Sequence, residues 1–349
     1  MMQSLQSTPK TDPAGLLRLR DGIYSPDLLI AAVGWLDFFT WLDEHPSSNS
    51  ATICSSLKID QRPTDVMLTL FTSMDLITNV AGNYHLTDYA KEYLTEGSPW
   101  NLGPYLETMK ERPICIEMRN ILKSGKPASW GSKKDEKEWA IAMERKDVAE
   151  KFTAAMDSRG AYLAPAMART IDCKEYKTLL DIAGGSGIYA CAVVAHNEHI
   201  RAAVFEKAPV DKAAQFSIKK KGMSDKISVV AGDMFEELPS GYDIHLISHA
   251  LHDWGEVAVT TLLKNSFQAL PPGGMIVIHD AHLNEDKTGP LPVAEFSVLL
   301  MYATEGKCYS VSEITTMLKR IGFIDTTFTP TTASRSIITA KKPVKITTR

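Results

Sequence analysis

The sequence has no apolar run long enough to cross a bilayer, because polar residues interrupt every hydrophobic stretch before the ~20 residues that a transmembrane helix needs. Its first fifteen residues are polar and lack the apolar core of a secretory signal peptide. These two absences predict a cytoplasmic protein with no membrane partner.

A strong charge of either sign is also missing. Lys and Arg number 38 against 42 Asp and Glu, a formal net charge of −4, so no basic surplus predicts a nucleic-acid partner. No CxxC pair occurs, which argues against disulfides and predicts free thiols in a reducing compartment. The five scattered cysteines are Cys54, Cys115, Cys173, Cys191 and Cys308.

What is present is an ordinary globular composition, 44% hydrophobic and 23% charged, in a chain of 349 residues that is long enough for two domains. We expect residues 1–15 to be a disordered arm and 16–105 a winged-helix-like domain. A helical linker with a charged stretch is expected over 106–160, and a second domain over 161–349.

The N-terminal domain is predicted from its helix and turn signals. Ser25 followed by Pro26 is typical of a helix start, with Ser25 as N-cap. Shorter helical stretches follow over 52–57 and 63–75, and then a hairpin over 77–86 with a turn at Gly82-Asn83. This order is that of a winged helix. Its segment 61–76 has one arginine and no lysine, which favours dimerisation or packing over DNA binding.

The C-terminal domain alternates apolar, strand-like runs with helical stretches. This alternation predicts an α/β domain with a parallel sheet covered on both faces. A capped helix is expected to begin near Ser310 and to end at Gly322, before a last strand over 334–340. The five runs are 178–182, 202–205, 227–230, 244–248 and 275–279.

A glycine-rich loop follows the first of these runs, in the sequence LLDIAGGSG over 179–187. Gly184, Gly185 and Gly187 let the backbone turn sharply and let a ligand approach closely. The loop also fits a dinucleotide pattern, since Gly185, Gly187 and Ala190 match GxGxxA and Glu206 lies near the spacing of a ribose-binding acid. A nicotinamide-dependent oxidoreductase is therefore an alternative.

Two further acids favour S-adenosylmethionine over a nicotinamide cofactor. Asp181 ends the first strand directly before the glycines, where dinucleotide folds usually need no acid. Asp233 follows the third strand beside Met234 and Phe235, where a carboxylate can hold an adenine amino group against an apolar wall. Acids after three successive strands suit a cationic cofactor that carries a ribose and an adenine.

On these motifs the chain resembles the S-adenosylmethionine-dependent O-methyltransferases related to the caffeate, acetylserotonin and hydroxyindole enzymes. The matching motifs are 181–187, Glu206, 232–235 and Leu251-His252-Asp253-Trp254, with Ala183 in place of a glycine often seen in the family. The resemblance implies a Rossmann-like class I catalytic domain, an N-terminal winged-helix dimerisation domain, a homodimer and a small-molecule substrate. We also expect Ser248 and Trp254 in the cofactor site.

The resemblance implies that His252 is the general base. A histidine suits this role because its pKa lies near neutrality, although a lone histidine is more often a structural residue in a turn. A metal site is the other alternative, since five histidines crowd the region and His245 and His249 have helical spacing. However, His245 lies in a strand-like run and no cysteine or carboxylate pair completes a ligand set, so we expect no metal.

Two acids usually flank the histidine of this family. Asp280, at the end of the fifth strand, matches the first of them. The second is normally a glutamate in a G-[KR]-E-R-T segment, where this chain has Cys308, and Glu305 lies three positions too early. A less supported base would suit a nucleophile that needs little activation. A thiol or thioether acceptor is therefore an alternative to a hydroxyl.

Substrate-pocket residues are predicted on the helices around these motifs, where plain core packing is an equal alternative. A non-catalytic regulator that binds the cofactor as a sensor is the remaining hypothesis, and the acidic balance argues against it. The expected pocket residues are Phe152, Met156, Arg159, His249, Phe296, Met301, Tyr302 and Cys308.

Overall fold

The computed structural model describes residues 5–7, 9–128 and 146–344. It divides into two compact units, each described here by itself. The sheet unit comprises 1–14, 132–282 and 311–349, and the helical unit comprises 15–131 and 283–310. These limits differ from the expected ones at four places: 1–14 and 132–160 fall in the sheet unit, and 106–131 and 283–310 fall in the helical unit.

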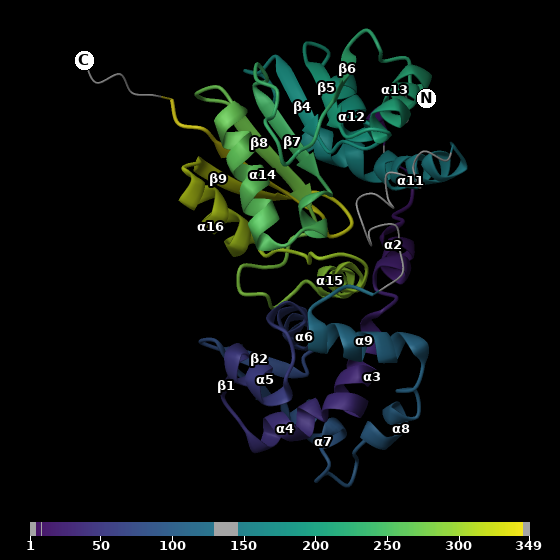
Figure 1. Ribbon diagram of the computed structural model, residues 1–349, viewed down its shortest axis with the longest axis vertical. Coiled ribbons are helices and arrows are strands. Elements are labelled where there is room, and N and C mark those ends of the chain that lie inside the picture. Colours follow the sequence, from purple (N-terminus) through teal and green to yellow (C-terminus); the bar gives the residue numbers. More distant parts are fainter. Residues whose placement is uncertain (1–4, 8, 129–145, 345–349) are drawn as a thin grey trace, which may run out of the picture. The chain divides into compact units, whose positions relative to one another are not determined.

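The sheet unit is built on seven strands in the order β6-β5-β4-β7-β8-β10-β9 (Figure 1). The first five run parallel, and β10 is antiparallel to both β8 and β9. This confirms the expected α/β domain. The strands are β4 (Thr178–Ile182), β5 (Arg201–Glu206), β6 (Ile227–Ala231), β7 (Ile244–Ser248), β8 (Met275–Asp280), β9 (Ile324–Pro330) and β10 (Ser336–Lys341).

The helices of the sheet unit form two groups. Helices α11 (Lys146–Thr170), α12 (Ile188–His196) and α13 (Val210–Lys220) pack on one another, and α14 (Glu256–Ala269) packs on α16 (Val311–Ile321). Strand order reverses between β4 and β7, so right-handed crossovers place the two groups on opposite faces. The carboxyl ends of β4 and β7 meet at this reversal, where open α/β sheets bind ligands.

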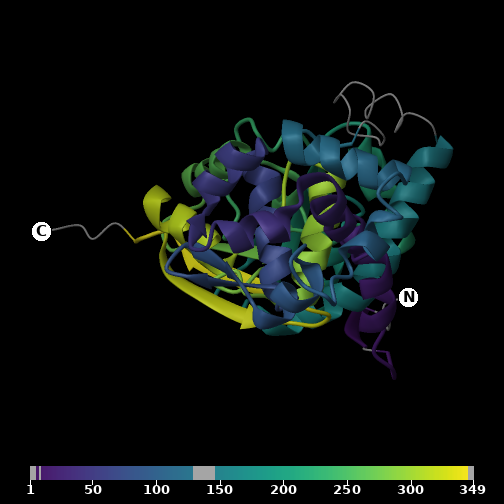
Figure 2. The same cartoon turned by 90° about the horizontal axis from the view of Figure 1, so that it is seen from below.

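Strand β9 was not predicted from the sequence. It forms one edge of the sheet, in yellow in Figures 1 and 2, and all of its residues are exposed. An edge strand exposed on both faces has no need of the alternating apolar pattern that marks a half-buried strand. The strand expected over 334–340 is present as β10, displaced by one to two residues.

The helical unit contains the predicted series of helices and a hairpin. Its three-stranded sheet has the order β1-β3-β2, and the hairpin turn lies at Ala81-Gly82, one residue before the expected position. Ser25 is the first helical residue and not the N-cap, a position that Tyr24 takes. The elements are α2 (Ala14–Asp21), α3 (Ser25–Leu36), α4 (Phe38–Glu44), β1 (Ser48–Asn49), α5 (Ser50–Leu57), α6 (Gln61–Ser73), β2 (Ile77–Val80), β3 (Asn83–Leu86), α7 (Asp88–Leu94), α8 (Gly103–Glu107), α9 (Pro113–Ser124) and α15 (Leu291–Ala303).

The segment 283–310 belongs to the helical unit because of helix α15. Most of its side chains are buried, and it packs on α6 and α3. Two ion pairs hold the ends of the same segment, since Lys287 and Lys307 both contact the carboxylate of Asp65 on α6. The strand–helix alternation alone does not predict that this helix belongs to the helical unit.

Arg62, the single arginine of segment 61–76, makes its contacts inside the helical unit. Its guanidinium donates to the carbonyl oxygens of Gly125, Thr304 and Gly306 at 2.8–3.0 Å. The guanidinium is therefore committed to protein carbonyls, and the absence of DNA binding by this module stays a prediction.

The beginning of the chain packs on the sheet unit. Leu5 is 2% exposed and belongs to the core around α12, and the Gln6 side chain donates to the Ala195 carbonyl at 2.6 Å. Asp12 accepts a hydrogen bond from the Tyr162 hydroxyl at 2.8 Å. These residues differ from the expected disordered arm, because one apolar side chain in a polar stretch is enough to dock it.

Candidate active site

The glycine loop connects β4 to α12 as predicted. Gly185 and Gly187 have positive φ values of 56° and 74°, which favour glycine. Ala183 has a φ of 54°, so the residue that departs from the resembled family sits where a glycine would relieve strain. A Cβ added to Gly184 would lie 2.7 Å from the Asp181 carboxyl group, which explains the need for glycine there.

Asp181 lies beneath this loop and is completely buried. Its Oδ2 accepts a hydrogen bond from the backbone N–H of Ala190 at 3.2 Å, which ties the loop to the first turns of α12. Burial raises the pKa of Asp181 to about 7, against the effect of that hydrogen bond. The contacts of Asp181 thus position the loop, while its predicted contact with the cofactor stays a prediction.

Glu206 ends β5 and faces the same loop. Its Oε2 accepts a hydrogen bond from the backbone N–H of Gly185 at 3.2 Å. Burial raises the pKa of Glu206 to about 7, although the N–H groups of Gly185 and Lys207 favour the charged form. A carboxylate held here can accept the paired hydroxyls of a ribose.

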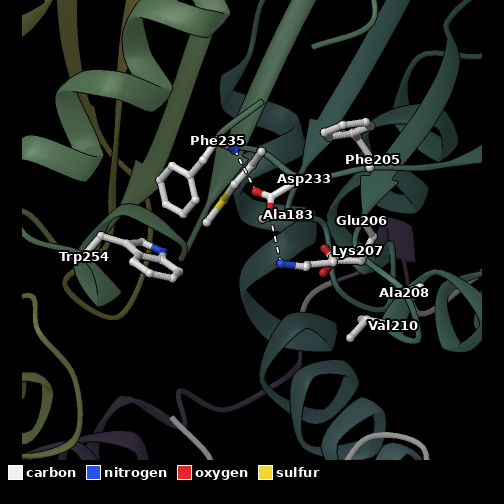
Figure 3. Close-up of a pocket in the computed structure, with 11 residues that line it drawn as sticks. Ala183, Phe205, Glu206, Lys207, Ala208, Val210, Asp233, Phe235 and Trp254 are labelled. Carbon is white, nitrogen blue, oxygen red and sulfur yellow. Dashed lines mark hydrogen bonds and ion pairs between the residues drawn. The ribbon is translucent and has the colours of Figure 1, made fainter. Parts of the chain in front are cut away.

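A cavity of about 150 Å³ opens beside Glu206 (Figure 3). Phe235 and Trp254 lie on one side of it, with ring centroids 4.8 Å apart in an edge-on contact, and Phe205 lies on the other side. Gly232 also lines the cavity and packs closely on Phe205. Any larger residue would clash there, because a Cβ would lie 2.3 Å from the Phe205 ring. The lining residues are Ala183, Phe205, Glu206, Lys207, Ala208, Val210, Gly232, Asp233, Met234, Phe235 and Trp254.

This cavity fits the adenosine part of S-adenosylmethionine. It offers apolar walls for a flat base, Glu206 for the ribose and Asp233 for the base edge, so it brings together five predicted cofactor residues with Met234, Phe235 and Trp254 among them. Lys207 and Phe205 also line it and were missed from the sequence. Their only signal was their position next to Glu206.

His252 and Asp280 form a buried pair in the sheet unit. His252 lies in a short 3₁₀ helix (Leu251–Asp253) after β7, and Asp280 ends the neighbouring strand β8. Nδ1 of His252 lies 2.5 Å from Oδ1 of Asp280, which also accepts the backbone N–H of Ala281 at 2.8 Å. The sequence predicted this pair, and the parallel sheet brings it together across neighbouring strand ends.

Asp280 is ionised at all ordinary pH values. Burial alone would raise its pKa, but His252, His282 and the Ala281 N–H outweigh it and hold the pKa of Asp280 at about 2. When His252 is neutral, its Nδ1–H donates to this carboxylate, and Nε2 is then the basic nitrogen. The pair can therefore accept a proton at Nε2 and stabilise the resulting imidazolium.

The other histidines of the region have separate roles. His245 lies in β7 and its Nδ1 pairs with the Ser266 hydroxyl at 2.9 Å, as expected for a residue outside the site. Ser248, predicted to bind the cofactor, has its hydroxyl paired with Nδ1 of His279 at 2.9 Å. His282 pairs with the Ser336 hydroxyl at 2.8 Å. These pairs fix the strand ends that carry His252 and Asp280.

One group in the described part of the chain has the spacing of metal ligands. Ligand atoms of His249, His252 and Asp280 lie within 4.8 Å of one another, and His249 has a strained φ of 53°. Burial and then the charges of Arg159, His279 and Arg335 place the pKa of His249 well below its usual value. The same positive surroundings oppose a dication, so the absence of a metal stays our prediction.

The predicted substrate-pocket residues fall in both units. Arg159, on α11, and His249 belong to the sheet unit, and the side chains of Phe152 and Met156 on the same helix lie outside the described residues. The Tyr302 ring stacks on that of Tyr24, with ring centroids 4.2 Å apart, and its hydroxyl donates to the Glu117 carboxylate. The residues in the helical unit are Phe296, Met301, Tyr302 and Cys308, all of them buried.

Cys308 is wholly buried in the helical unit. Its backbone N–H donates to the Ser297 hydroxyl of α15 at 3.0 Å. This contact attaches the chain after α15 back to that helix. The side chain, at the position of a family glutamate, stays a predicted pocket residue.

Comparison with known proteins finds similarity over most of the chain. The family model for the O-methyltransferase domain matches residues 118–324. The chain is 27% identical over 316 residues to 3-hydroxy-5-methyl-1-naphthoate 3-O-methyltransferase from Streptomyces sahachiroi, covering 89% of each protein.

Solved structures agree with the fold described above. An O-methyltransferase family 2 protein from Planctomyces limnophilus, in complex with apigenin, is 30% identical with a TM-score of 0.87, covering 97% of this chain and 98% of that one. Human N-acetylserotonin methyltransferase in complex with S-adenosylmethionine has a TM-score of 0.60 at 22% identity, covering 97% of this chain and all of that one. The predicted class I methyltransferase fold is thereby confirmed.

Proposed function

Because this chain belongs to the O-methyltransferase family and uses S-adenosylmethionine, we propose that it methylates a hydroxyl group of a small aromatic acceptor with His252 as general base. The observation that carries the proposal is the buried His252–Asp280 pair at the carboxyl ends of β7 and β8. Membership in this family also removes the nicotinamide-dependent oxidoreductase from consideration.

The proposed reaction needs a proton acceptor, because the hydroxyl oxygen must lose its proton as it attacks the methyl group. When bound, S-adenosylmethionine supplies an electrophilic methyl group whose transfer leaves S-adenosylhomocysteine. Nε2 of His252 removes the hydroxyl proton as the oxygen attacks, and ionised Asp280 stabilises the imidazolium that forms. Glu206 and Asp233 hold the adenosine part, and the backbone of the loop over 183–187 packs around the cofactor.

An aromatic hydroxyl is the acceptor that the relatives favour. The Streptomyces relative is named for a hydroxynaphthoate, and the Planctomyces structure was solved with apigenin. A phenol is also acidic enough to be deprotonated by a histidine that the ionised carboxylate of Asp280 supports. A thiol acceptor remains the alternative, because Cys308 takes the place of the second acid.

The helical unit supports a homodimer as the working form. Leu16 and Leu19 lie one turn apart on α2 and form an exposed apolar stripe, at 73% and 74% exposed, and Ile23, just after the helix, is 59% exposed. Trp100 and Tyr105 are 63% and 77% exposed in the same unit. Exposed apolar side chains such as these suit burial against a second copy.

The test is incubation with labelled S-adenosylmethionine and a matched panel of phenols, the corresponding thiophenols and anilines. We expect label in the methyl ethers of phenols, identified by product mass and fragmentation. Transfer to thiophenols alone would support the thiol alternative. Binding of S-adenosylhomocysteine without transfer to any acceptor, together with specific DNA binding, would favour a regulator.

A further inference from the structure

Lys207 and Asp233 form an ion pair at the cofactor cavity. Lys207 directly follows β5 and Asp233 follows β6, and Nζ of Lys207 lies 2.9 Å from Oδ2 of Asp233 (Figure 3). The other oxygen, Oδ1, accepts the backbone N–H of Phe235 at 2.9 Å. The carboxylate is therefore held at both oxygens, with an ammonium group beside it.

The pair presents both signs of hydrogen-bonding group to a ligand. Burial favours the neutral acid, but the Phe235 N–H and Lys207 outweigh it, so the pKa of Asp233 is below its usual value and the group is ionised near neutral pH. The Lys207 side chain is 54% exposed and that of Asp233 25% exposed. An ion pair so open to water is weak, so the ammonium can turn to another acceptor at little cost.

Adenine needs only the carboxylate of this pair. Its exocyclic amino group is a donor, which Asp233 can accept. A 6-oxopurine carries an acceptor oxygen at that position and a donor N1–H next to it. A carboxylate alone would repel the oxygen, whereas a carboxylate with an adjacent ammonium matches the oxygen and the N1–H together.

We propose that the Lys207–Asp233 pair allows the cofactor cavity to bind 6-oxopurine nucleosides, in particular S-inosyl-L-homocysteine, the deaminated form of S-adenosyl-L-homocysteine. Lys207 donates to the 6-oxo group, and Asp233 accepts from N1–H. Lys207 is thus a specificity-determining residue for the base, while Glu206 and the walls formed by Phe205, Phe235 and Trp254 serve both ligands.

The experiment is calorimetric titration of the full chain with S-adenosyl- and S-inosyl-L-homocysteine. The wild-type protein is expected to bind the inosyl compound within about tenfold of the adenosyl one, as a retained hydrogen bond to a charged group would allow. Lys207→Met removes the donor and is expected to weaken inosyl binding by about 10- to 150-fold, the range for a charged hydrogen bond, and adenosyl binding much less.

Two further variants sharpen the test. Lys207→Arg keeps a charged donor and is expected to restore inosyl binding, and Lys212→Met on α13 removes an exposed lysine outside the cavity and should change neither affinity. Equal weakening of both ligands by Lys207→Met would overturn the proposal. So would inosyl binding to the wild-type protein that is more than about 100-fold weaker than adenosyl binding, the loss expected when a buried polar group stays unpaired.

Discussion

At the scale of single residues, the proposed chemistry rests on the imidazole of His252. Asp280 fixes its tautomer at a Nδ1–Oδ1 distance of 2.5 Å, and the carboxylate stays ionised because its pKa is about 2. The family's second acid is absent from its usual position, which Cys308 takes. In the sheet, the ionised carboxylate of Asp280 therefore supports the proposed base.

Replacing the base should separate catalysis from binding. We expect His252→Ala to lower kcat by about 10²- to 10⁴-fold, the usual contribution of a general base, while the Kd for S-adenosylhomocysteine stays as in the wild type. Single-turnover rates and calorimetry measure the two quantities. His45→Ala, at an exposed position in the helical unit, is the control. Full turnover in the His252 variant would rule out the base role.

Cofactor affinity should depend on pH through Glu206. Its pKa is raised to about 7 by burial, so much of it is protonated below neutrality, whereas ribose hydroxyls donate best to the ionised form. Affinity for S-adenosylhomocysteine should therefore rise with pH, by up to about tenfold per unit below the pKa of about 7, and level off above it.

The measurement is the Kd of S-adenosylhomocysteine across that pH range in buffers of different ionisation enthalpy, which also counts the protons released. Glu206→Gln cannot ionise and should flatten the profile while weakening binding. A wild-type affinity that falls as the pH rises would contradict the assignment. Asp181, whose pKa is also about 7, is the other group that could contribute.

At the scale of elements, the loop between β4 and α12 depends on close packing more than on flexibility. A Cβ at Gly184 would lie 2.7 Å from the Asp181 carboxyl group and 3.0 Å from Val204, both of them buried. Neither neighbour can move without disturbing β4 or β5. The loop would therefore have to shift away from the cofactor.

Gly184→Ala should consequently weaken S-adenosylhomocysteine binding by about tenfold or more, since small displacements in such loops cost one or more hydrogen bonds. Thermal-shift titration with the ligand measures this loss. Gly97→Ala is the control, because a Cβ there meets nothing within 4 Å. Unchanged affinity in the Gly184 variant would show that the loop adjusts freely.

At the scale of the whole molecule, the exposed apolar stripe of α2 is the feature that an isolated chain leaves unexplained. Leu16 and Leu19 are each more than 70% exposed, although the chain has ample apolar core elsewhere. Burying such side chains stabilises association by roughly 25 cal/mol per Å². We therefore assign this stripe to the proposed dimer interface.

Leu19→Glu should shift the protein from dimer to monomer in light scattering coupled to size-exclusion chromatography, because it places a charge in the buried contact. Phe216→Glu is the matched control, since Phe216 is 66% exposed on α13 of the sheet unit. A wild-type protein that is monomeric at micromolar concentration would remove the dimer from the proposal.

Local sequence pattern was enough to predict much of the sheet unit. Asp181 to Gly187, Glu206, Asp233, His252 and Asp280 were all placed at strand ends by the sequence, because parallel strands read as continuous apolar runs and turn residues follow them directly. Glycines with positive φ and the motif around His252 are equally local. The parallel core, its glycine loop and the strand-end positions of His252 and Asp280 were therefore determined by the sequence.

Tertiary structure decided what depends on contacts between distant segments. Helix α15 looks like any apolar helix in the sequence, and only its packing on α6 and the Asp65 ion pairs place 283–310 with the helical unit. Lys207 belongs to no motif, and the role proposed for it depends on its Nζ lying 2.9 Å from Oδ2 of Asp233. Partner choice and long-range pairing are properties of the folded chain, because no local periodicity records which surfaces will meet.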